Sequence, residues 1–461
     1  MADASAICRS HSFESDEEID GIRKRLLTWY EANKRDLPWR SRKAQSLNEK
    51  AYAVWVSEVM LQQTRVAAVI DKYKIWMKKF PAVEDLAKAS LDEVQELWSG
   101  MGYYSRCKKL HEAAQKNTKV VNDLNGIIPT SCEELAKQLP GVGRYTAAAI
   151  ASIAFNERVG IVDGNVIRVL SRLRRVGVAH NSKIAENHFW FCSNKLVDEE
   201  CPGDFNQALM ELGATVCTPK SPACSSCPVS SSCLALKQVH EQRKFASSKF
   251  SKTDNGSLPD IESSGCSLCL PPTEPWDSDK GVTNFPRRGK KTAVKTEEFI
   301  SGVTSFRSND IDYYLIVKRP STGLLAGLWE FPTVPFLSSN GEKKIQLLGH
   351  LRKFLSEDEL SEVEIRESKT VSHLFSHRRH IYHIHKIILS INHQTSQSLS
   401  KDLVHFKWVT EEELFRLAIS AAVKKMFEAS GDIVSPNVGS KTRKRKLNGT
   451  QQSLEKFFKS K

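Results

Sequence analysis

The chain has 461 residues, 11 cysteines and a formal net charge of +13. This length is typical of two or three domains with sizeable cores, and because no apolar stretch approaches the length of a membrane span, we expect a soluble protein. The positive charge favours a polyanionic partner, and the cysteines indicate thiols or metal sites rather than disulfides. The first residues are acidic and lack an Arg-rich amphipathic pattern, so we expect neither a secretory signal nor a clear mitochondrial presequence.

Composition and periodicity divide the chain into five predicted parts. Residues 1–20 are predicted to be disordered, and 21–237 show helical periodicity without clear alternation, which predicts an all-α domain. Residues 238–295 are rich in Ser, Pro, Gly and charge, as expected of a connector. Residues 296–430 combine strand-like and helical stretches, which predicts an α/β domain, and 431–461 form a polar, basic tail that we expect to be disordered.

Two carboxylates of the all-α domain are candidates for acid–base chemistry. Glu58 lies in an apolar run, and desolvation there would raise its pKa and keep a proton available near neutral pH. The alternative is an exposed Glu on the polar face of a helix. Asp163, in the VDGN stretch, lies at an expected helix start, where an N-cap is the alternative. Together, a protonated Glu and an ionised Asp form the pair that cleavage of a glycosidic bond requires.

A short hairpin between two predicted helices precedes that Asp. Residues 139–150 read LPGVGRYTAAAI, in which Gly141 and Gly143 permit the positive φ of a tight turn and a close approach of the backbone to another surface. Arg144 begins the second helix, whose unpaired N-terminal amide groups would suit a DNA phosphate. An ordinary helix–turn–helix corner without a ligand is the alternative.

Four cysteines after the all-α core form the strongest single motif. Their pattern is Cys-x6-Cys-x2-Cys-x5-Cys, with ligands Cys217, Cys224, Cys227 and Cys233. Thiolates so close in the chain can surround one metal centre. Both zinc and a [4Fe–4S] cluster are held by four cysteines, so this chemistry leaves the two open.

Several sequence blocks resemble those of a known protein superfamily. The hairpin LPGVGRYT, the Asp of VDGN and the cysteine loop 217–233 resemble the helix–hairpin–helix DNA glycosylase superfamily. Within it, SEVMLQQT, GMGYYSR and DFNQALMELGATVC are similar to the MutY family of adenine DNA glycosylases. The match covers about 21–236 and resumes in the connector and second domain. The resemblance therefore implies an all-α glycosylase domain in which the four cysteines hold a [4Fe–4S] cluster.

The resemblance also implies an activity in base-excision repair. An adenine mispaired with 8-oxoguanine, or with guanine, would be flipped out of the duplex, because its glycosidic bond cannot be reached inside the stack, and then hydrolysed off. Glu58 would protonate adenine N7 and Asp163 would stabilise the sugar cation. Tyr145 and Asn165 would position these groups.

Further residues gain roles from the same resemblance. Gln63 and Tyr103 match residues that wedge into the duplex, although core packing is the alternative for Tyr103. Tyr145 stands where relatives of the endonuclease III type, which cleave both base and backbone, carry a Lys that forms a Schiff base. A phenol cannot form an imine, so the sequence predicts a monofunctional glycosylase without efficient AP lyase activity.

The second domain is similar to the Nudix (MutT-like) fold through its GLWEFP stretch, 327–332. No acidic Arg-Glu-x-x-Glu-Glu box follows, so we expect neither a Mg²⁺ site nor pyrophosphate hydrolysis. In the MutY family this domain recognises 8-oxoguanine, which implies that role for Phe375, Ser376 and His377. The alternative is a His-rich strand edge, made by His373, His380 and His383.

The connector contains a Cys-x2-Cys pair and resembles the connectors of animal family members, which hold zinc. A four-ligand set would consist of Cys8, His11, Cys266 and Cys269. Pro259 and Ser171 stand where the family has further cysteines, which is a departure from its pattern. Through the connector we also expect contacts with the checkpoint clamp and an AP endonuclease.

The tail contains two short motifs. Its Gln-x-x-Leu-x-x-Phe-Phe pattern resembles a box that binds the sliding clamp PCNA, with anchors Gln451, Leu454, Phe457 and Phe458. A frayed amphipathic end is the alternative. KTRKRK at 441–446 predicts nuclear localisation, and its alternative is a non-specific DNA-binding patch.

These motifs leave three candidate functions for the protein. The leading hypothesis is an adenine glycosylase. Base removal coupled to strand cleavage is disfavoured by Tyr145, and a catalytically silent DNA-binding or scaffold protein is disfavoured by Glu58 and Asp163.

Overall fold

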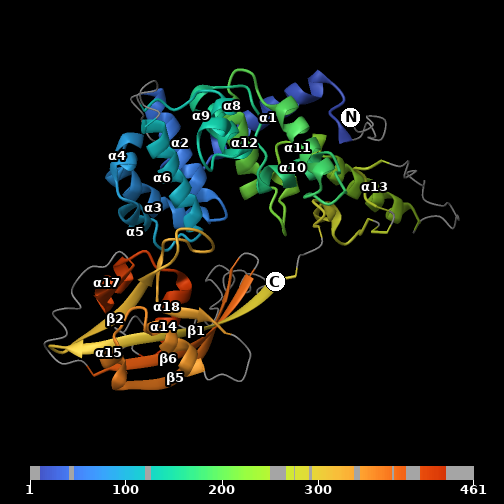
Figure 1. Cartoon of the computed structure of the whole chain (residues 1–461). Coiled ribbons are helices and arrows are strands. Elements are labelled where there is room, and N and C mark those ends of the chain that lie inside the picture. The colour runs from blue at the N-terminus through green and yellow to red at the C-terminus, as the bar shows by residue number, and fades with distance from the viewer. Residues whose placement is uncertain are drawn as a thin grey trace, which may run out of the picture. The chain divides into compact units, whose positions relative to one another are not determined.

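The computed structural model describes these parts of the chain: 11–40, 46–119, 126–249, 266–271, 273–274, 276–289, 293–336, 343–375, 378–390 and 405–431. The chain divides into two compact units (Figure 1). One comprises Met1–Lys295, Lys318–Glu330 and Glu411–Ala421, and the other Thr296–Val317, Phe331–Thr410 and Ala422–Lys461. Within the described residues, no helix combines the length and the apolar character that a membrane crossing requires.

The first unit is built mainly of helices. They are α1 (Asp16–Asn33), α2 (Leu47–Leu61), α3 (Val66–Lys79), α4 (Val83–Lys88), α5 (Leu91–Leu97), α6 (Tyr104–Lys119), α8 (Cys132–Gln138), α9 (Arg144–Phe155), α10 (Gly164–Leu173), α11 (Lys183–Leu196), α12 (Pro202–Thr215), α13 (Leu234–Lys249) and α17 (Glu411–Arg416). The 3₁₀ helices η3 (Cys224–Ser226), η4 (Ser230–Ser232) and η5 (Gly281–Asn284) lie beside them.

Serine hydroxyls start many of these helices. Each accepts a hydrogen bond from the backbone amide three residues later, as seen at Ser15, Ser46, Ser90, Ser131 and Ser182. Such a bond satisfies one of the amide groups that a helix N-terminus leaves without a partner. The helix starts are therefore encoded locally.

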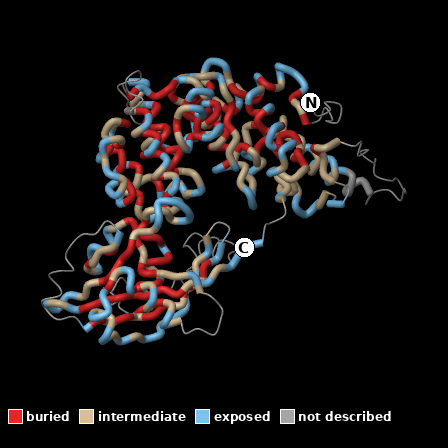
Figure 2. The backbone as a smooth tube through the Cα atoms, viewed as in Figure 1, coloured by how far each residue is buried: buried red, intermediate tan, exposed pale blue. Residues whose placement is uncertain are grey.

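The helix α9 lies between two hydrophobic clusters. Ala147 and Ile150 belong to a cluster with residues of α2, whereas Ala148 and Ala149 belong to a cluster with residues of α10 and α12. Small side chains let neighbouring helices approach closely: a Cβ on Gly203, in α12, would lie 2.7 Å from a carbonyl oxygen of α9. The runs 51–60 of α2 and 146–152 of α9 are buried throughout, and buried segments are drawn in red in Figure 2. These helices form the frame of the candidate site.

The N-terminal residues correct one prediction. Residues 1–20 were expected to be disordered, but the structure orders 11–20, with α1 beginning at Asp16. His11 and Phe13 are only 1% and 3% exposed, and Phe13 packs in the same cluster as Ile19. An acidic composition concealed these apolar contacts, because burial depends on a partner far along the chain.

The connector also differs from its prediction. The segment 238–295 begins inside α13, and part of it packs against the helices of the first unit, to which it belongs. The carbonyl of Leu268, a buried residue, accepts hydrogen bonds from the amides of Gly177 and Val178, at 2.7 and 3.2 Å. Phe285 is buried against Val282 and the start of α13. These parts of the connector are therefore attached elements and not a free linker.

The second unit contains most of a seven-stranded sheet in the described residues. Its strands are β1 (Lys295–Ser308), β2 (Ile311–Lys318), β3 (Trp329–Glu330), β4 (Thr333–Pro335), β5 (Val363–Leu374), β6 (Arg378–Leu389) and β7 (Phe406–Thr410). Their order is β3-β2-β1-β6-β5, with β4 paired to β1 and β7 to β2 (Figure 1). Three helices accompany the sheet, namely α14 (Lys343–Leu351), α15 (Glu357–Ser361) and α18 (Ala421–Ala429).

Alternation along the strands buries both faces of this sheet. Tyr313 of β2 stacks on Phe306 within a cluster that includes Leu347 of α14. The next residue, Tyr314, makes an edge contact with Phe427 of α18. Because neighbouring side chains of a strand point to opposite faces, α14 and α18 cover opposite sides of the sheet.

Candidate active site

Glu58 is buried in the middle of the α-helical unit. Although it lies on α2 among apolar residues, its carboxyl group lines a cavity of about 520 Å³, and the residue is only 5% exposed. Burial raises its pKa to about 7; the hydroxyl of Tyr145 opposes this rise, and the charge of Asp163 adds to it. The alternative of an exposed helical Glu is therefore wrong.

Tyr145 is held against this carboxyl group. It lies in the first turn of α9, directly after the hairpin, and its hydroxyl donates a hydrogen bond of 2.5 Å to Oε2 of Glu58. The sulfur of Met210, from α12, lies 3.4 Å from the same hydroxyl oxygen. Burial and the neighbouring carboxylates raise the pKa of Tyr145 well above 10, so the phenol stays neutral and acts as a donor.

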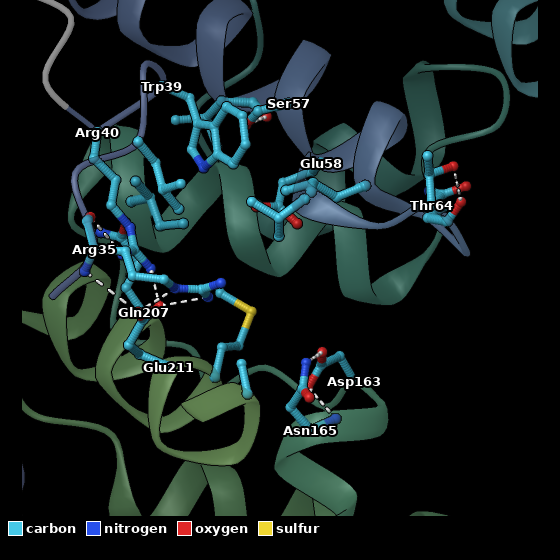
Figure 3. Close-up of a pocket in the computed structure, with 18 of the residues that line it drawn as sticks. Arg35, Trp39, Arg40, Ser57, Glu58, Thr64, Asp163, Asn165, Gln207 and Glu211 are labelled. Carbon is cyan, nitrogen blue, oxygen red and sulfur yellow. Dashed lines mark hydrogen bonds and ion pairs between the residues drawn. The ribbon is translucent and has the colours of Figure 1, made fainter. Parts of the chain in front are cut away.

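Asp163 enters the same cavity from α10. It is the N-cap of that helix, which the sequence offered as the alternative to a catalytic role: its Oδ1 accepts from the amides of Asn165 and Val166, at 2.9 and 2.7 Å. Its Oδ2 accepts from the side-chain amide of Asn165 at 2.8 Å. Burial raises the pKa of Asp163, while these hydrogen bonds act against the rise. The N-cap and the cavity-facing carboxylate are thus one residue, as Figure 3 shows.

Arg168 supports Asn165 from behind. Its guanidinium donates to Oδ1 of Asn165 at 2.8 Å, and also to the carbonyls of Gly213 and Cys217, at 2.5 and 2.7 Å. A Cβ on Gly213 would lie 2.7 Å from Cβ of Asn165, so only glycine fits there. The carboxylate of Asp163 is therefore oriented by a fixed amide.

A charged group that the sequence reasoning missed forms another wall of the cavity. Glu211, on α12, is 1% exposed and accepts from Arg35 at 2.5 and 2.9 Å and from Arg40 at 2.9 Å (Figure 3). Burial raises the pKa of Glu211, but the two guanidinium groups outweigh it and the net pKa is lowered. Arg40 also donates to Gln207 at 3.2 Å. The block DFNQALMELGATVC, which resembles the MutY family, contains Gln207 and Glu211, and this resemblance could have indicated both residues as part of the site.

Two exposed turns carry the predicted wedge residues, and Gln63 of the first turn lines the cavity. Gln63, between α2 and α3, has φ +55°, and Tyr103, between α5 and α6, has φ +48°. Residues other than Gly rarely adopt this left-handed backbone conformation. Tyr103 is 42% exposed, so the alternative that it packs in the core is wrong.

The hairpin between α8 and α9 confirms one of the two glycine expectations. Gly141 has φ +80°, and a Cβ there would lie 2.7 Å from Cβ of Lys109. Gly143 has φ −89°, so the expectation of a positive φ is wrong there; it is the N-cap of α9 and provides no side-chain cap. Arg144 places its guanidinium over the ring of Trp190, 3.9 Å from the centroid. The first amides of α9 thus lack a side-chain cap.

The four cysteines of the loop 217–233 surround one hollow. Burial raises the pKa of Cys224, Cys227 and Cys233 in this hollow. Arg172, which is buried, donates to the sulfur of Cys217 at 3.2 Å. The four thiols therefore share one part of the structure, where they could hold a metal centre.

The predicted zinc ligands come together from distant parts of the chain. Nε2 of His11 lies 3.2 Å from Sγ of Cys269, and Nδ1 of His11 lies 2.7 Å from the carbonyl oxygen of Arg174. Cys266 completes the group of three. Cys8, the fourth predicted ligand, lies outside the described residues.

Phe375 lies at the end of the β5–β6 hairpin. Its amide donates to the carbonyl of Arg378 at 2.8 Å, and its ring meets the rings of His373 and His380 with centroids 4.5 and 4.8 Å apart. His380 also pairs with Glu297 of β1 at 3.2 Å. Two histidines of the strand edge, His373 and His380, therefore pack on Phe375, whereas His383 contacts Phe336 and Glu298. Ser376 and His377 lie outside the described residues, as do the tail residues Gln451, Leu454, Phe457 and Phe458.

Comparison with known proteins matches both units. The HhH-GPD superfamily of base excision DNA repair proteins matches residues 56–193, and the NUDIX domain matches 303–429. The human adenine DNA glycosylase is 44% identical over 99% of this chain and 84% of its own length. The adenine DNA glycosylase of Schizosaccharomyces pombe is 36% identical over 95% of each chain. The chain belongs to the adenine DNA glycosylases.

Membership in this family confirms the central predictions. The fold class is an all-α helix–hairpin–helix domain followed by a Nudix-like α/β domain. The activity is that of a base-excision repair enzyme that removes adenine from DNA. The C-terminal domain of mouse MUTYH, solved in a complex with human PCNA, is similar over 29% of this chain and 85% of its own, with 26% identity and a TM-score of 0.23.

Proposed function

We propose that this adenine DNA glycosylase removes adenine paired with 8-oxoguanine, or with guanine, and that it cleaves the base alone. The observation that carries the proposal is the pair of Glu58 and Asp163 facing one cavity (Figure 3). A carboxyl group with a pKa of about 7 retains a proton near neutral pH, whereas the second carboxylate is held by hydrogen bonds that favour its charged form.

Glu58 is the general acid. Its Oε2 accepts the hydroxyl of Tyr145, so the transferable proton belongs on Oε1. Transfer of that proton to N7 of a flipped adenine makes the base a neutral leaving group, and the glycosidic electron pair leaves with it. The hydrogen bond from Tyr145 then stabilises the glutamate anion that is left behind.

Asp163 stabilises the positive charge that develops on the sugar. Asn165 and the first amides of α10 orient its carboxylate, so little reorganisation is needed when the charge appears. Water then attacks C1′ and gives up one proton to the Glu58 carboxylate, which completes hydrolysis, leaves an abasic site and restores the protonated acid. A transient adduct between Asp163 and C1′ is compatible with the same geometry.

Cleavage of the base alone is supported by the groups that line the described part of the cavity. Among the described residues that line the cavity there is no lysine, and the hydroxyl of Tyr145 is bound to Glu58. Without an amine no Schiff base forms, and β-elimination of the DNA strand has no efficient route.

DNA would be held by features around the cavity. Gln63 and Tyr103 are placed on exposed turns suited to insertion between bases. Gly141, Gly143 and Arg144 would bring the uncapped N-terminus of α9 to a phosphate. In the Nudix-like unit, Phe375 would pack beside 8-oxoguanine, with Ser376 and His377 as hydrogen-bonding partners.

Two metal centres accompany this function. A [4Fe–4S] cluster would be held by Cys217, Cys224, Cys227 and Cys233, and the lining of one hollow by all four cysteines supports this. A zinc ion would be held by His11, Cys266 and Cys269, whose ligand atoms already converge, with Cys8 as the fourth ligand.

The remaining partners are proposed from sequence motifs. PCNA would bind the tail through Gln451, Leu454, Phe457 and Phe458, whereas the connector would contact the checkpoint clamp and an AP endonuclease. The basic run at 441–446 supports a location in the nucleus.

A single-turnover assay tests the proposed function. A duplex with adenine opposite 8-oxoguanine should yield strand breaks only after alkali, and borohydride should trap no efficient covalent adduct on abasic DNA. Strand breaks without alkali would show lyase activity. Binding of the duplex without loss of adenine would show that this duplex is not a substrate of the enzyme.

A further inference from the structure

The two exposed turns that carry Gln63 and Tyr103 meet at one side chain. Both residues have left-handed backbone conformations, with φ of +55° and +48°, although neither is a glycine. Such conformations persist only where the surroundings hold them in place. The side chain of Arg106, in the first turn of α6, lies between the two turns.

Arg106 binds the first turn and the preceding end of α2 through its two terminal guanidinium nitrogens, Nη1 and Nη2. Its Nη1 donates to the carbonyls of Val59 and Met60 at 2.8 and 3.2 Å, and also to the carbonyl of Gln62. Its Nη2 donates to the hydroxyl of Thr64 at 3.1 Å. The two residues that flank Gln63 are therefore both bonded to one guanidinium.

The same guanidinium reaches the second turn. Nη2 donates to the carbonyl of Gly102 at 3.4 Å, directly before Tyr103. The guanidinium carbon lies 5.1 Å from the centroid of the Tyr103 ring and 5.4 Å from that of Trp98. Trp98 in turn donates to the Gly102 carbonyl at 3.0 Å. One planar group thus connects both turns at several points.

We propose that Arg106 is a positioning residue that fixes the turns of Gln63 and Tyr103 relative to each other, so that the two side chains enter the DNA duplex as one unit. The inference rests on the proposed insertion of these residues. The planar fork of a guanidinium has nitrogens directed to separate acceptors, whereas the ammonium of a lysine is a single point. An Arg106→Lys variant would therefore keep the charge and lose the connection.

The test uses the full-length holoenzyme and a DNA probe that reports unstacking. The probe is a duplex with 2-aminopurine in place of adenine, opposite 8-oxoguanine, because this base becomes brighter when it leaves the stack. The matched control is Arg23→Lys. The guanidinium of Arg23 also donates to backbone carbonyls, but these are at the C-terminal end of α11 and belong to Lys195, Leu196 and Val197. Adenine excision is measured in parallel under single-turnover conditions.

We expect Arg106→Lys at saturating concentration to lower the fluorescence increase at least threefold and the excision rate at least tenfold. Arg23→Lys should remain within twofold of the wild type in both, even if both variants melt at lower temperature. An undiminished fluorescence increase with Arg106→Lys would overturn the proposal. If that variant does not fold, Thr64→Val removes the Nη2 acceptor of the first turn, together with the 3.3 Å hydrogen bond from the same hydroxyl to the Gln62 carbonyl. An at least threefold smaller increase would support the proposal, and an unchanged one would overturn it.

Different results would contradict the proposed substrate and the positioning role of Arg106. If the wild type excises no adenine from this duplex, the proposed substrate is wrong. If the wild type excises adenine but the Arg106→Lys variant distorts the probe equally well, only the positioning role is wrong.

Discussion

Replacing Glu58 by Gln should abolish base excision and at the same time stabilise the protein at neutral and alkaline pH. The side chain keeps its size, and its amide oxygen can still accept the hydroxyl of Tyr145. The transferable proton is lost, and a general acid accounts for about 10²- to 10⁴-fold in rate. DNA affinity should change little, because the substitution leaves the turns and the hairpin intact.

The stabilisation follows from the raised pKa. Below the ordinary value of 4.5, Glu58 is protonated in both the folded and unfolded states and folding incurs no cost. As pH rises from 4.5 to about 7, the unfolded chain ionises while the folded chain retains its proton, so the folded state loses stability. At about 1.4 kcal/mol per pKa unit the full loss is about 3 kcal/mol, reached above pH 7. Glutamine removes this cost.

Denaturant unfolding at about pH 5 and pH 8 measures the effect, with cluster absorbance followed to confirm the holoenzyme. The variant should gain stability mainly at pH 8. Glu211→Gln is the matched control with the opposite sign, because its carboxylate is bound by Arg35 and Arg40 and its loss should cost about 2 kcal/mol. Equal stabilisation of Glu58→Gln at both pH values, or retained excision, would refute the reasoning. In the wild type, the excision rate should fall as pH rises above about 7.

Three further predictions concern other parts of the molecule. Tyr145→Phe removes the hydrogen bond that lowers the pKa of Glu58, so the alkaline limb of the pH–rate profile should move to higher pH; an unmoved limb would contradict this. Gly141→Ala adds a Cβ where φ is +80°, and should cost about 1–3 kcal/mol of unfolding free energy and weaken DNA binding, whereas unchanged melting and affinity would count against the hairpin's role. Cys266→Ser with Cys269→Ser should remove zinc in metal analysis and leave the iron content unchanged; equal zinc in both proteins would exclude the site.

Local chemistry let the sequence predict several features directly. Asp163 is the N-cap of α10, since a short carboxylate before a helix satisfies amides two and three residues away. Gly141 has the positive φ expected of the hairpin, but Gly143 does not, because one left-handed residue suffices to reverse the chain there. The same residues sit in blocks that resemble a known family, and the comparisons confirmed that resemblance.

The protonation of Glu58 was decided by the tertiary structure. An apolar run around a Glu is compatible with either exposure or burial, and the packing of α9 against α2, which brings Tyr145 to the carboxyl group, decides for burial. The salt bridges of Glu211 with Arg35 and Arg40 join residues more than 170 positions apart. No local pattern reports such pairs, because each partner alone resembles an ordinary surface charge.

What the sequence by itself determined is therefore the set of chemical groups and the short elements that carry them. The tertiary structure decided which groups meet. His11 and Cys269 are 258 positions apart yet lie 3.2 Å from each other, and residues 11–20 are ordered by contacts that their acidic composition concealed. Arg106 likewise gains a role only because it lies between two turns. Burial and proximity depend on the whole fold, whereas caps and tight turns depend on a few consecutive residues.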